Sequence, residues 1–323
     1  MQLRMSELWY SSIVTEKKPK LKYRIRNWQH YNKALVKRGS LTIWVEQQSM
    51  DAWLNSTPST RPGRPRKYAD AAIYCLLLLR EVYHLPLRNT QGFAASLFDF
   101  LQVDLPVPDY STLSRRARQL EVKLKSSAKA IKHLLIDSSG LKVFGEGEWK
   151  VRQHGVDKRR TWRKLHISVD GATQQITAAV ITDNKTLDRQ ALPALLEQTE
   201  VAVEKVCTDG AYDVQSCYAA IKKKQAQAVI PPKSNAVMSS KAVLADRNAN
   251  LAQIGKVGMK EWKKQSEYHR RSLVECSFFR LKVVFSDKLR SRREATQKTE
   301  AMMRCAALNR MTELGMPDSY IVQ

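Results

Sequence analysis

The stretch from Tyr268 to Lys282 constrains the fold of this chain more than any other. It contains no Gly or Pro, and its apolar residues recur at helical spacing, so it predicts a helix. At roughly 100° per residue, one stripe about 60° wide carries the polar side chains Tyr268, Arg271, Glu275 and Lys282. We therefore expect a helix that is packed on most sides and directs these side chains into one cleft. The alternative is a buried ion pair between Glu275 and Arg271, which are i,i+4 neighbours.

The charge of the chain indicates a polyanionic partner. The 323 residues include 55 Lys and Arg against 31 Asp and Glu, which gives a formal net charge of +24. An excess of this size favours nucleic acid as the partner. The longest apolar run, 69–79, is too short to span a bilayer, and the N-terminus lacks the apolar core of a signal peptide. We therefore expect no membrane partner.

The cysteines indicate a reducing compartment. There are five of them, an odd number, and no CxxC pair occurs. A disulfide framework and a zinc site both depend on paired cysteines. We therefore expect reduced, mostly buried thiols in a cytoplasmic protein.

Residues 1–67 are expected to form a basic N-terminal arm and linker, with a partly helical stretch at 28–53. The segment 57–67 contains three prolines and a glycine, which prevent regular secondary structure there. We expect its Arg64 and Arg66 to lie along a DNA minor groove, and a solvated tether is the alternative.

Residues 68–125 predict a helical DNA-binding domain. The first helix runs through 71–79, the second starts near 88, and the third covers 110–120 and carries Arg115 and Arg116. Two helices, a tight turn and a short cationic third helix form the outline of a helix-turn-helix module. An ordinary trihelical bundle would give the same pattern, but the cationic third helix favours DNA binding.

Residues 131–315 predict an α/β catalytic domain. Strands are expected at 131–137, 165–170 and 175–182, followed by a helix at 187–200 and a strand at 203–208. A helix capped by Asp213 and a short strand at 227–230 complete a βββαβαβ order. This order predicts a mixed sheet covered by helices, and a last helix, 295–314, should pack back on the sheet.

Three acidic residues are placed where they can meet. Asp137 ends the first expected strand, Asp209 follows the fourth, and Glu275 comes from the helix described first. Open α/β sheets bind ligands at the carboxyl ends of their strands. Carboxylates at close range raise one another's pKa, and a hard divalent cation such as Mg²⁺ resolves the repulsion. Two such ions about 3.5–4 Å apart can activate water and stabilise the leaving 3′-oxygen of a phosphodiester.

These residues resemble a known family. Asp137, Asp209 and Glu275 are similar to the DDE triad of bacterial insertion-sequence transposases, which have an RNase H-like fold. Tyr268-x2-Arg271-x3-Glu275-x6-Lys282 matches the Y-(2)-R-(3)-E-(6)-K signature at all four positions, and the segment 209–213 resembles the second-aspartate motif. The resemblance covers about residues 65–312 and is closest to the fifth insertion-sequence family.

The resemblance carries several implications. It implies a nucleoid-associated bacterial protein that binds double-stranded DNA at terminal inverted repeats and forms a homo-oligomer in the synaptic complex. It also implies Mg²⁺-dependent cleavage that frees 3′-hydroxyls, with Mn²⁺ able to substitute, followed by joining to target DNA. Asp137, Asp209 and Glu275 are the implied metal ligands. Arg271 and Lys282 are implied to contact the transposon-end backbone, and Tyr268 to line the site.

Two basic segments are expected to contact the DNA backbone. The segment 149–163 interleaves tryptophans with cations, among them Lys158, Arg159 and Arg160. We expect it to follow the backbone, and a solvated hairpin edge is the alternative. The run 288–293 is expected to contact phosphate. His166, within the second strand, is expected to be a packed strand residue.

Two other functions remain open for a chain of this kind. One is a transposase-derived DNA-binding regulator that has lost its chemistry, although all three acids and both signature cations are present. The other is a plain RNase H-like nuclease, which would hydrolyse phosphodiesters and give no joined product.

Overall fold

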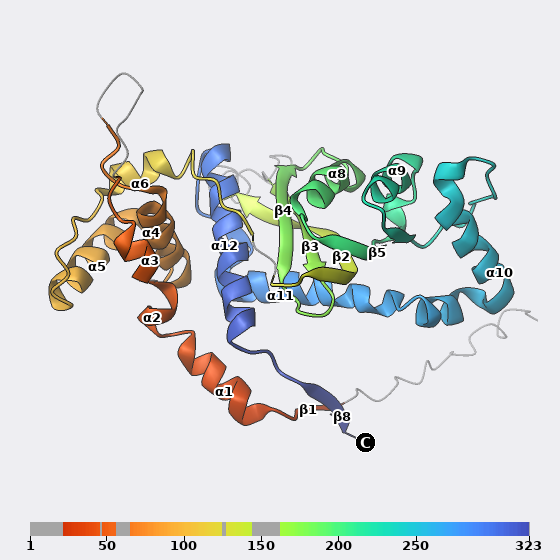
Figure 1. Cartoon of the computed structure of the whole chain (residues 1–323), viewed down its shortest axis with the longest axis horizontal. Helices are drawn as coiled ribbons and strands as arrows, with labels where there is room; N and C mark the ends of the chain where they lie inside the picture. The colour runs from red at the N-terminus through yellow and green to blue at the C-terminus, as the bar shows by residue number, and fades with distance from the viewer. Residues whose placement is uncertain (1–21, 46, 56–64, 125–126, 144–161, 323) are drawn as a thin grey trace, which may run out of the picture.

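The computed structural model describes residues 22–45, 47–55, 65–124, 127–143 and 162–322 (Figure 1). The expected DNA contacts Arg64, Lys158, Arg159 and Arg160 lie outside these residues. Figure 1 shows a group of short helices on one side and a helix-covered sheet on the other, with helix α12 (Glu294–Leu314) between them.

The N-terminal segment is folded over most of its described residues. Strand β1 (Lys22–Ile25) pairs antiparallel with β8 (Ser319–Val322), and helices α1 (Trp28–Lys37), α2 (Leu41–Trp44) and α3 (Gln47–Asp51) follow. Trp44 and Trp53 are buried, and their indole N–H groups donate to the carbonyl oxygens of Arg38 and Pro106. The stretch 28–53, predicted to be partly helical within the N-terminal arm, therefore contains three helices and packs through its tryptophans.

The predicted helical domain is present. It contains α4 (Asp70–Val82), α5 (Leu87–Phe100) and α6 (Tyr110–Arg116). Asp109 caps α6 by accepting a hydrogen bond from the Ser111 N–H at 2.8 Å. Helix α6 ends before the predicted residue 120. The α5–α6 connection, 101–109, is also longer than the three- to four-residue turn of a helix-turn-helix module. The predicted tight turn is therefore wrong, because Pro106 and Pro108 hold the connection extended.

The sheet has the predicted order of elements. Its strands are β2 (Ala130–Val143), β3 (Trp162–Asp170), β4 (Ile176–Asp183), β5 (Ala202–Cys207) and β6 (Gln227–Val229), in spatial order β4-β3-β2-β5-β6. The first three pair antiparallel, and β5 and β6 join in parallel. Parallel neighbours require crossovers, which α8 (Asp188–Gln198) and α9 (Gln215–Lys223) provide. The prediction of an RNase H-like mixed sheet flanked by helices is confirmed.

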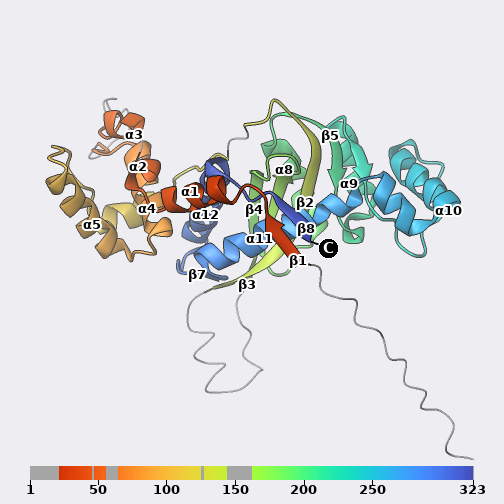
Figure 2. The same ribbon diagram turned by 90° about the horizontal axis from the view of Figure 1, so that it is seen from below.

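Each face of the sheet has its own hydrophobic core. Helices α8 and α9 cover one face over residues such as Leu134 and Ile136. Helices α11 (Ser272–Phe285) and α12 cover the other face, where Leu135 and Ile167 belong to a core that continues into the helical domain. The two helix layers lie on opposite sides of the strands in Figure 1, and Figure 2 shows α11 running along the sheet. The helical domain and the sheet are therefore joined by one apolar core.

The remaining elements lie between β6 and α12. They are η2 (Ala242–Leu244), α10 (Ala245–Gln265), η3 (Tyr268–Arg271) and the short strand β7 (Lys288–Leu289). Helix α10 is broken at Gly258, whose φ of 79° lies in the left-handed region that favours glycine. The part after the break folds back, since Trp262 Nε1 donates to Asn250 Oδ1.

One predicted helix cap is wrong. Helix α9 begins at Gln215 after Val214, and Asp213 does not cap it. The Asp213 carboxylate is instead buried and accepts hydrogen bonds from the Tyr218 hydroxyl, the Lys233 N–H and the Arg247 guanidinium. These groups come from three separate segments, so tertiary contacts override the local capping preference.

The expectations about thiols and membranes can be compared with the structure. All five cysteines are free and all but Cys276 are buried. His166 is buried within β3 and its Nε2 lies 2.9 Å from Thr182 Oγ1, as predicted for a packed residue. Across the described ranges, none of the helices has the length and hydropathy that a bilayer span requires.

Candidate active site

The candidate site lies at a gap along one edge of β2. Strand β2 pairs with β5 up to Leu135 and with β7 from Lys142, both on the same edge. Asp137 lies between these two pairings. The first strand was predicted to end at Asp137, but it continues to Val143 because β3 remains paired with it as far as Lys142. Asp137 therefore projects from the middle of a strand, just beyond the point where its neighbour β5 ends.

Asp137 is an acid in a partly buried setting. Its side chain is 19% exposed, and its Oδ1 accepts a hydrogen bond from the Ser138 N–H at 2.8 Å. Burial raises the pKa of Asp137, and the charges of Asp209 and Glu275 add to this rise, while the Ser138 N–H and Arg271 oppose it. The β2–β5 register, with Leu135 beside Cys207, brings Asp209 level with Asp137, and Arg271 contacts both Asp137 and Glu275.

The other two acids come from elements that end or begin at the gap. Asp209 follows β5 and caps the single turn η1 (Gly210–Tyr212), where its Oδ1 accepts from the Ala211 N–H at 2.9 Å. Glu275 lies in the first turn of α11, and its side chain is 54% exposed. Strand β5 and helix α11 thus bring these carboxylates towards Asp137 from different parts of the chain.

Arg271 bridges two of the acids. One guanidinium nitrogen lies 2.9 Å from Asp137 Oδ2, and another lies 2.5 Å from Glu275 Oε1. Burial alone would lower the pKa of Arg271, but Tyr268, Glu275 and Asp137 together raise it. The sequence left open whether Arg271 and Glu275 form a plain ion pair or line a cleft. In the structure Arg271 forms the ion pair with Glu275 and a second ion pair with Asp137.

The other signature residues surround this bridge. The Tyr268 ring packs on Trp262 with centroids 5.6 Å apart, and the Arg271 guanidinium lies 6.0 Å from its centroid. Burial raises the pKa of Tyr268 to about 12, so its hydroxyl stays protonated near neutral pH. Lys282 Nζ donates to Ser139 Oγ at 2.7 Å, and Ser139 lies two residues beyond Asp137 on the same face of β2. All four signature residues therefore contact this side of the sheet or the bridge beside it.

The helix that carries Glu275 differs from its prediction in two ways. It starts as the 3₁₀ turn η3 and becomes α-helical only at Ser272. It is also less enclosed than expected, because Cys276, Phe279 and Val283 are exposed, the last two at 69% and 67%. One side of α11 packs on β2, β3 and α12, and these three residues lie on the side that no described element covers. The prediction of a helix packed on most sides is wrong.

The donor set suits a hard divalent cation. Among the described residues, no three His, Cys, Asp or Glu side chains converge closely enough to hold a metal ion in this arrangement. Asp137 and Glu275 nevertheless share one cation already, the Arg271 guanidinium. Asp137, Asp209 and Glu275 offer only carboxylate oxygens, which Mg²⁺ and Mn²⁺ prefer. The chemistry of these donors suits such an ion, and in this arrangement two of them are held by Arg271 instead.

Two neighbours of the acids were not singled out in the sequence analysis. Tyr212, within the 209–213 segment, is buried, its hydroxyl has no hydrogen-bond partner among the described residues, and burial raises its pKa. Asp137 and Asp209 both act on it electrostatically. Trp262 supports Tyr268, and no motif in the sequence marks it. The 209–213 motif was the only available signal for Tyr212.

The remaining predicted DNA contacts lie in the helical domain. Arg115 is exposed and donates to Thr112 Oγ1 within its own helix. Arg116 is engaged inside the domain, where it donates to the Tyr68 carbonyl and pairs with Asp70. Arg66 donates to Gln119 Oε1 at 2.6 Å. The structure separates these residues from the acids, and their contact with DNA stays a prediction.

Family models identify the class of protein. A model described as a transposase DDE domain matches residues 128–310, which hold the sheet, the acids and most of α12. A second model with the same description matches residues 36–146. The chain therefore belongs to the DDE transposase family. The particular insertion-sequence family stays a prediction, carried by the four-position signature.

Solved transposase structures are similar at low identity. The piggyBac transposase synaptic complex with hairpin DNA matches 85% of this chain and 75% of that chain, with 12% identity and a TM-score of 0.41. The Drosophila P element transposase strand transfer complex matches 51% of this chain and 38% of that chain, with 12% identity and a TM-score of 0.28. These likenesses are too remote to add to the fold assignment.

Proposed function

We propose that this transposase binds the terminal inverted repeats of its own element, cleaves them to free 3′-hydroxyl ends and joins these ends to target DNA. The observation that carries the proposal is the pair of carboxylates on Arg271, with Asp209 beside them, at the gap along β2. Family membership supports the reaction class. The net charge of +24 supports a DNA partner, and joining two ends would use a homo-oligomer.

In this proposal Asp137, Asp209 and Glu275 hold Mg²⁺, for which Mn²⁺ can substitute. The bound ions would supply Lewis-acid stabilisation of the phosphodiester and activation of the attacking water. Arg271 exchanges its carboxylate partners for a DNA phosphate, since a guanidinium binds either group with two parallel hydrogen bonds. Lys282, held by Ser139 on the same face of β2, is placed to bind a neighbouring phosphate. Tyr268 keeps its proton and orients Arg271 from one side.

A cleavage assay tests this proposal. The substrate is a duplex that copies the DNA directly outside the coding sequence, incubated with Mg²⁺, with Mn²⁺ or with a chelator. We expect metal-dependent nicks that leave 3′-hydroxyls, and joined products when target DNA is added. Glu275→Gln should still bind the duplex but cleave about 10³-fold more slowly, because Lewis-acid stabilisation is worth several kcal/mol.

The exposed Glu197, on α8, provides the matched control. Glu197→Gln removes the same charge on the opposite face of the sheet and should cleave at the wild-type rate. Equal cleavage by wild type and Glu275→Gln would refute the assignment of the acids. Cleavage without any joined product would favour the plain nuclease, and binding without cleavage would favour the DNA-binding regulator.

A further inference from the structure

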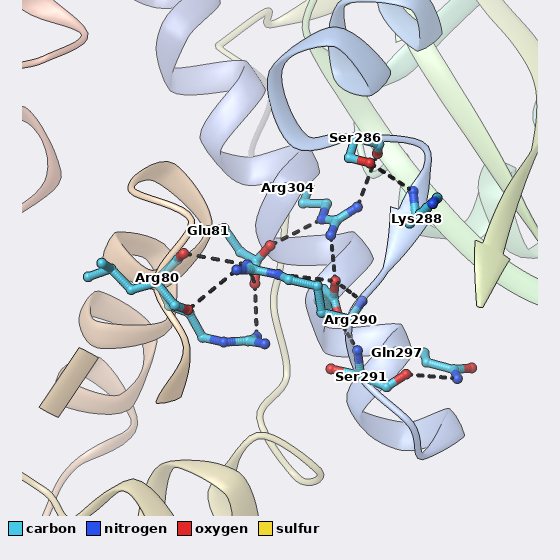
Figure 3. Close-up of polar contacts among 10 residues, drawn as sticks. Arg80, Glu81, Ser286, Lys288, Arg290, Ser291, Gln297 and Arg304 are labelled. Atoms are coloured by element: carbon cyan, nitrogen blue, oxygen red, sulfur yellow. Dashed lines mark hydrogen bonds and ion pairs between the residues drawn. The ribbon is translucent and has the colours of Figure 1, made fainter. Parts of the chain in front are cut away.

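A second cationic site lies where the helical domain meets the catalytic domain. A cavity of about 400 Å³ opens between the ends of α4 and α6 on one side and the start of α12 on the other. We call it the junction cleft and define its rim by Arg118, from the helical domain, and by Arg292 and Arg293, which precede α12. All three rim arginines are exposed. Figure 3 shows the residues beneath this rim.

The base of the junction cleft is a network of ion pairs in which both acids are already paired with arginines. Glu81, from α4, contacts Arg80 at 2.9 Å, Arg290 at 2.7 Å and Arg304 at 3.1 Å (Figure 3). Glu300, from α12, contacts Arg304 at 2.5 Å. Both carboxylates are almost fully buried, so three guanidiniums face two acids and the base retains one positive charge. No acid at the base is left to neutralise the rim.

Backbone N–H groups also bind one of the acids at the base of the cleft. The Glu300 carboxylate accepts hydrogen bonds from the Arg290 and Ser291 N–H groups, each at 2.8 Å. The segment that carries Arg292 and Arg293 is therefore tied to α12. Arg290, in the run predicted to contact phosphate, turns inward to Glu81 and to carbonyl oxygens of α4 and the loop after it. The later arginines of that run, Arg292 and Arg293, are exposed.

The rim itself offers unpaired positive charge. Within the described parts of the chain, Arg118, Arg292 and Arg293 form no side-chain ion pair or hydrogen bond. Glu294, the acid in the first turn of α12, is exposed and lies 3.3 Å from Arg163. The rim also adjoins the N-terminus of α12, where the helix dipole favours an anion. The cleft is thus a polar hollow with three available guanidiniums, which is a site for phosphate groups.

The position of the cleft indicates that its phosphates belong to a DNA duplex. Arg118 lies three residues after Arg115, on the part of the helical domain expected to contact DNA. Arg292 and Arg293 follow β7, which pairs with β2, the strand that carries Asp137. A duplex held by the helical domain and cut at the acids would run between these elements. A small anion does not require cations from both domains, whereas a duplex that spans the two domains does.

We propose that the junction cleft binds backbone phosphates of the transposon-end duplex between the helical domain and the acids, with Arg118 on one side and Arg292 and Arg293 on the other. The inference rests on the proposed function. The buried network fixes α4 against α12, so the spacing of the rim cations is set before DNA binds. Contacts to the backbone position a duplex without reading its sequence.

The test measures how salt weakens DNA binding by the full-length protein. The probe is a duplex that copies the DNA outside the coding sequence. Each lost phosphate contact lowers the slope of log affinity against log salt by about 0.9. We expect Arg118→Gln to lower the slope by about 0.9, and Arg292→Gln with Arg293→Gln to lower it by about 1.8. Thermal stability should not change, because the three side chains pair with no described residue.

The matched control is Lys222→Gln with Lys223→Gln, two exposed cations at the end of α9, which covers the other face of the sheet. It should leave the slope near the wild-type value. An equal loss of slope in both double variants, or no loss in either, would overturn the proposal. Inorganic phosphate at constant ionic strength should not displace the duplex. Binding of inorganic phosphate that depends on the rim arginines, in a protein whose duplex affinity and salt slope do not depend on them, would assign the cleft to a small anion instead.

The two proposals fail in different ways. If the wild-type protein neither binds nor cleaves the flanking duplex, the proposed function is refuted. If it does both, and the rim variants keep the wild-type salt slope, only the junction cleft is refuted.

Discussion

Two arginines of the described structure, each between two carboxylates, lie in very different surroundings. Arg271 lies between Asp137 and Glu275, and Arg304 lies between Glu81 and Glu300. The members of the first set are 22%, 19% and 54% exposed, whereas each member of the second is at most 2% exposed. Burial separates their roles. The pairs of the first arginine are open to solvent, as the proposed exchange for a metal ion requires, and the pairs of the second connect α4 to α12 out of contact with water.

The surroundings strengthen this contrast. In the buried set, Arg80 and Arg290 also contact Glu81, and two backbone N–H groups bind Glu300. Burial alone would raise the pKa of Glu300, but the charge of Arg304, the hydrogen bonds from Ser291 and Arg290 and the charge of Arg80 hold it below its ordinary value. In the exposed set, water can replace any partner that leaves. Exposed ion pairs contribute about 0–1 kcal/mol, while removing one partner of a buried pair costs about 3–5 kcal/mol.

The largest expected difference between the two sets is in the rate at which the cysteine beside each set is labelled. Cys276 adjoins Glu275 and is exposed, while Cys305 adjoins Arg304 and is buried. Burial raises the pKa of Cys305 to about 12, so it remains a poorly reactive thiol below about pH 11. In the native protein Cys276 should label at least about 10³-fold faster, because Cys305 reacts only when the core opens. Peptide mapping after timed labelling measures this. Comparable rates would break the contrast, and Cys276→Ser should remove the fast phase.

Stability should separate the sets next. Glu81→Gln leaves three guanidiniums facing one acid in a dry setting, and it should lower the free energy of unfolding by about 3–5 kcal/mol. Asp70→Asn, in the same helix, removes an acid that is 65% exposed and paired with Arg116, so it should cost no more than about 1 kcal/mol. Urea denaturation measures both. A loss for Glu81→Gln as small as that for Asp70→Asn would show that the buried network does not hold the domains together.

Cation binding should give the smallest of the three effects. Without DNA, Arg271 competes with a metal ion for Asp137 and Glu275. Two partly exposed ion pairs are worth up to about 2 kcal/mol, so Arg271→Gln should bind Mn²⁺ roughly 2- to 30-fold more tightly. Arg270→Gln removes the same charge one residue away, where it pairs with Glu267. Titration of DNA-free protein with Mn²⁺ compares the two variants. Equal affinities would mean that Arg271 does not occupy the place of the metal.

Local patterns predicted most of the fold. Alternating and helical periodicities predicted the βββαβαβ order, and a short turn joins the antiparallel strands β3 and β4. The four-position signature led to Arg271 and Glu275, which the structure joins. These features depend on residues close in sequence, where side-chain spacing determines the geometry.

Features that depend on distant partners were not predicted. Asp137 was expected at a strand end, but pairing with β3 extends the strand beyond it. Arg290 was expected to contact phosphate, yet Glu81, from a helix far earlier in the chain, holds it inside. The helix that carries Glu275 was expected to be packed on most sides, yet its Phe279 and Val283 are exposed. Sequence spacing does not reveal which segment lies opposite a side chain in the folded protein.

The most direct test of the central claim uses Asp209, the acid that Arg271 does not hold. Asp209→Asn should bind the flanking duplex as wild type does, unfold at the same temperature and give no measurable strand cleavage with Mg²⁺ or Mn²⁺. Asp51→Asn, at an exposed position in α3, serves as its control and should cleave normally. Cleavage by Asp209→Asn at the wild-type rate would contradict a catalytic centre built from Asp137, Asp209 and Glu275.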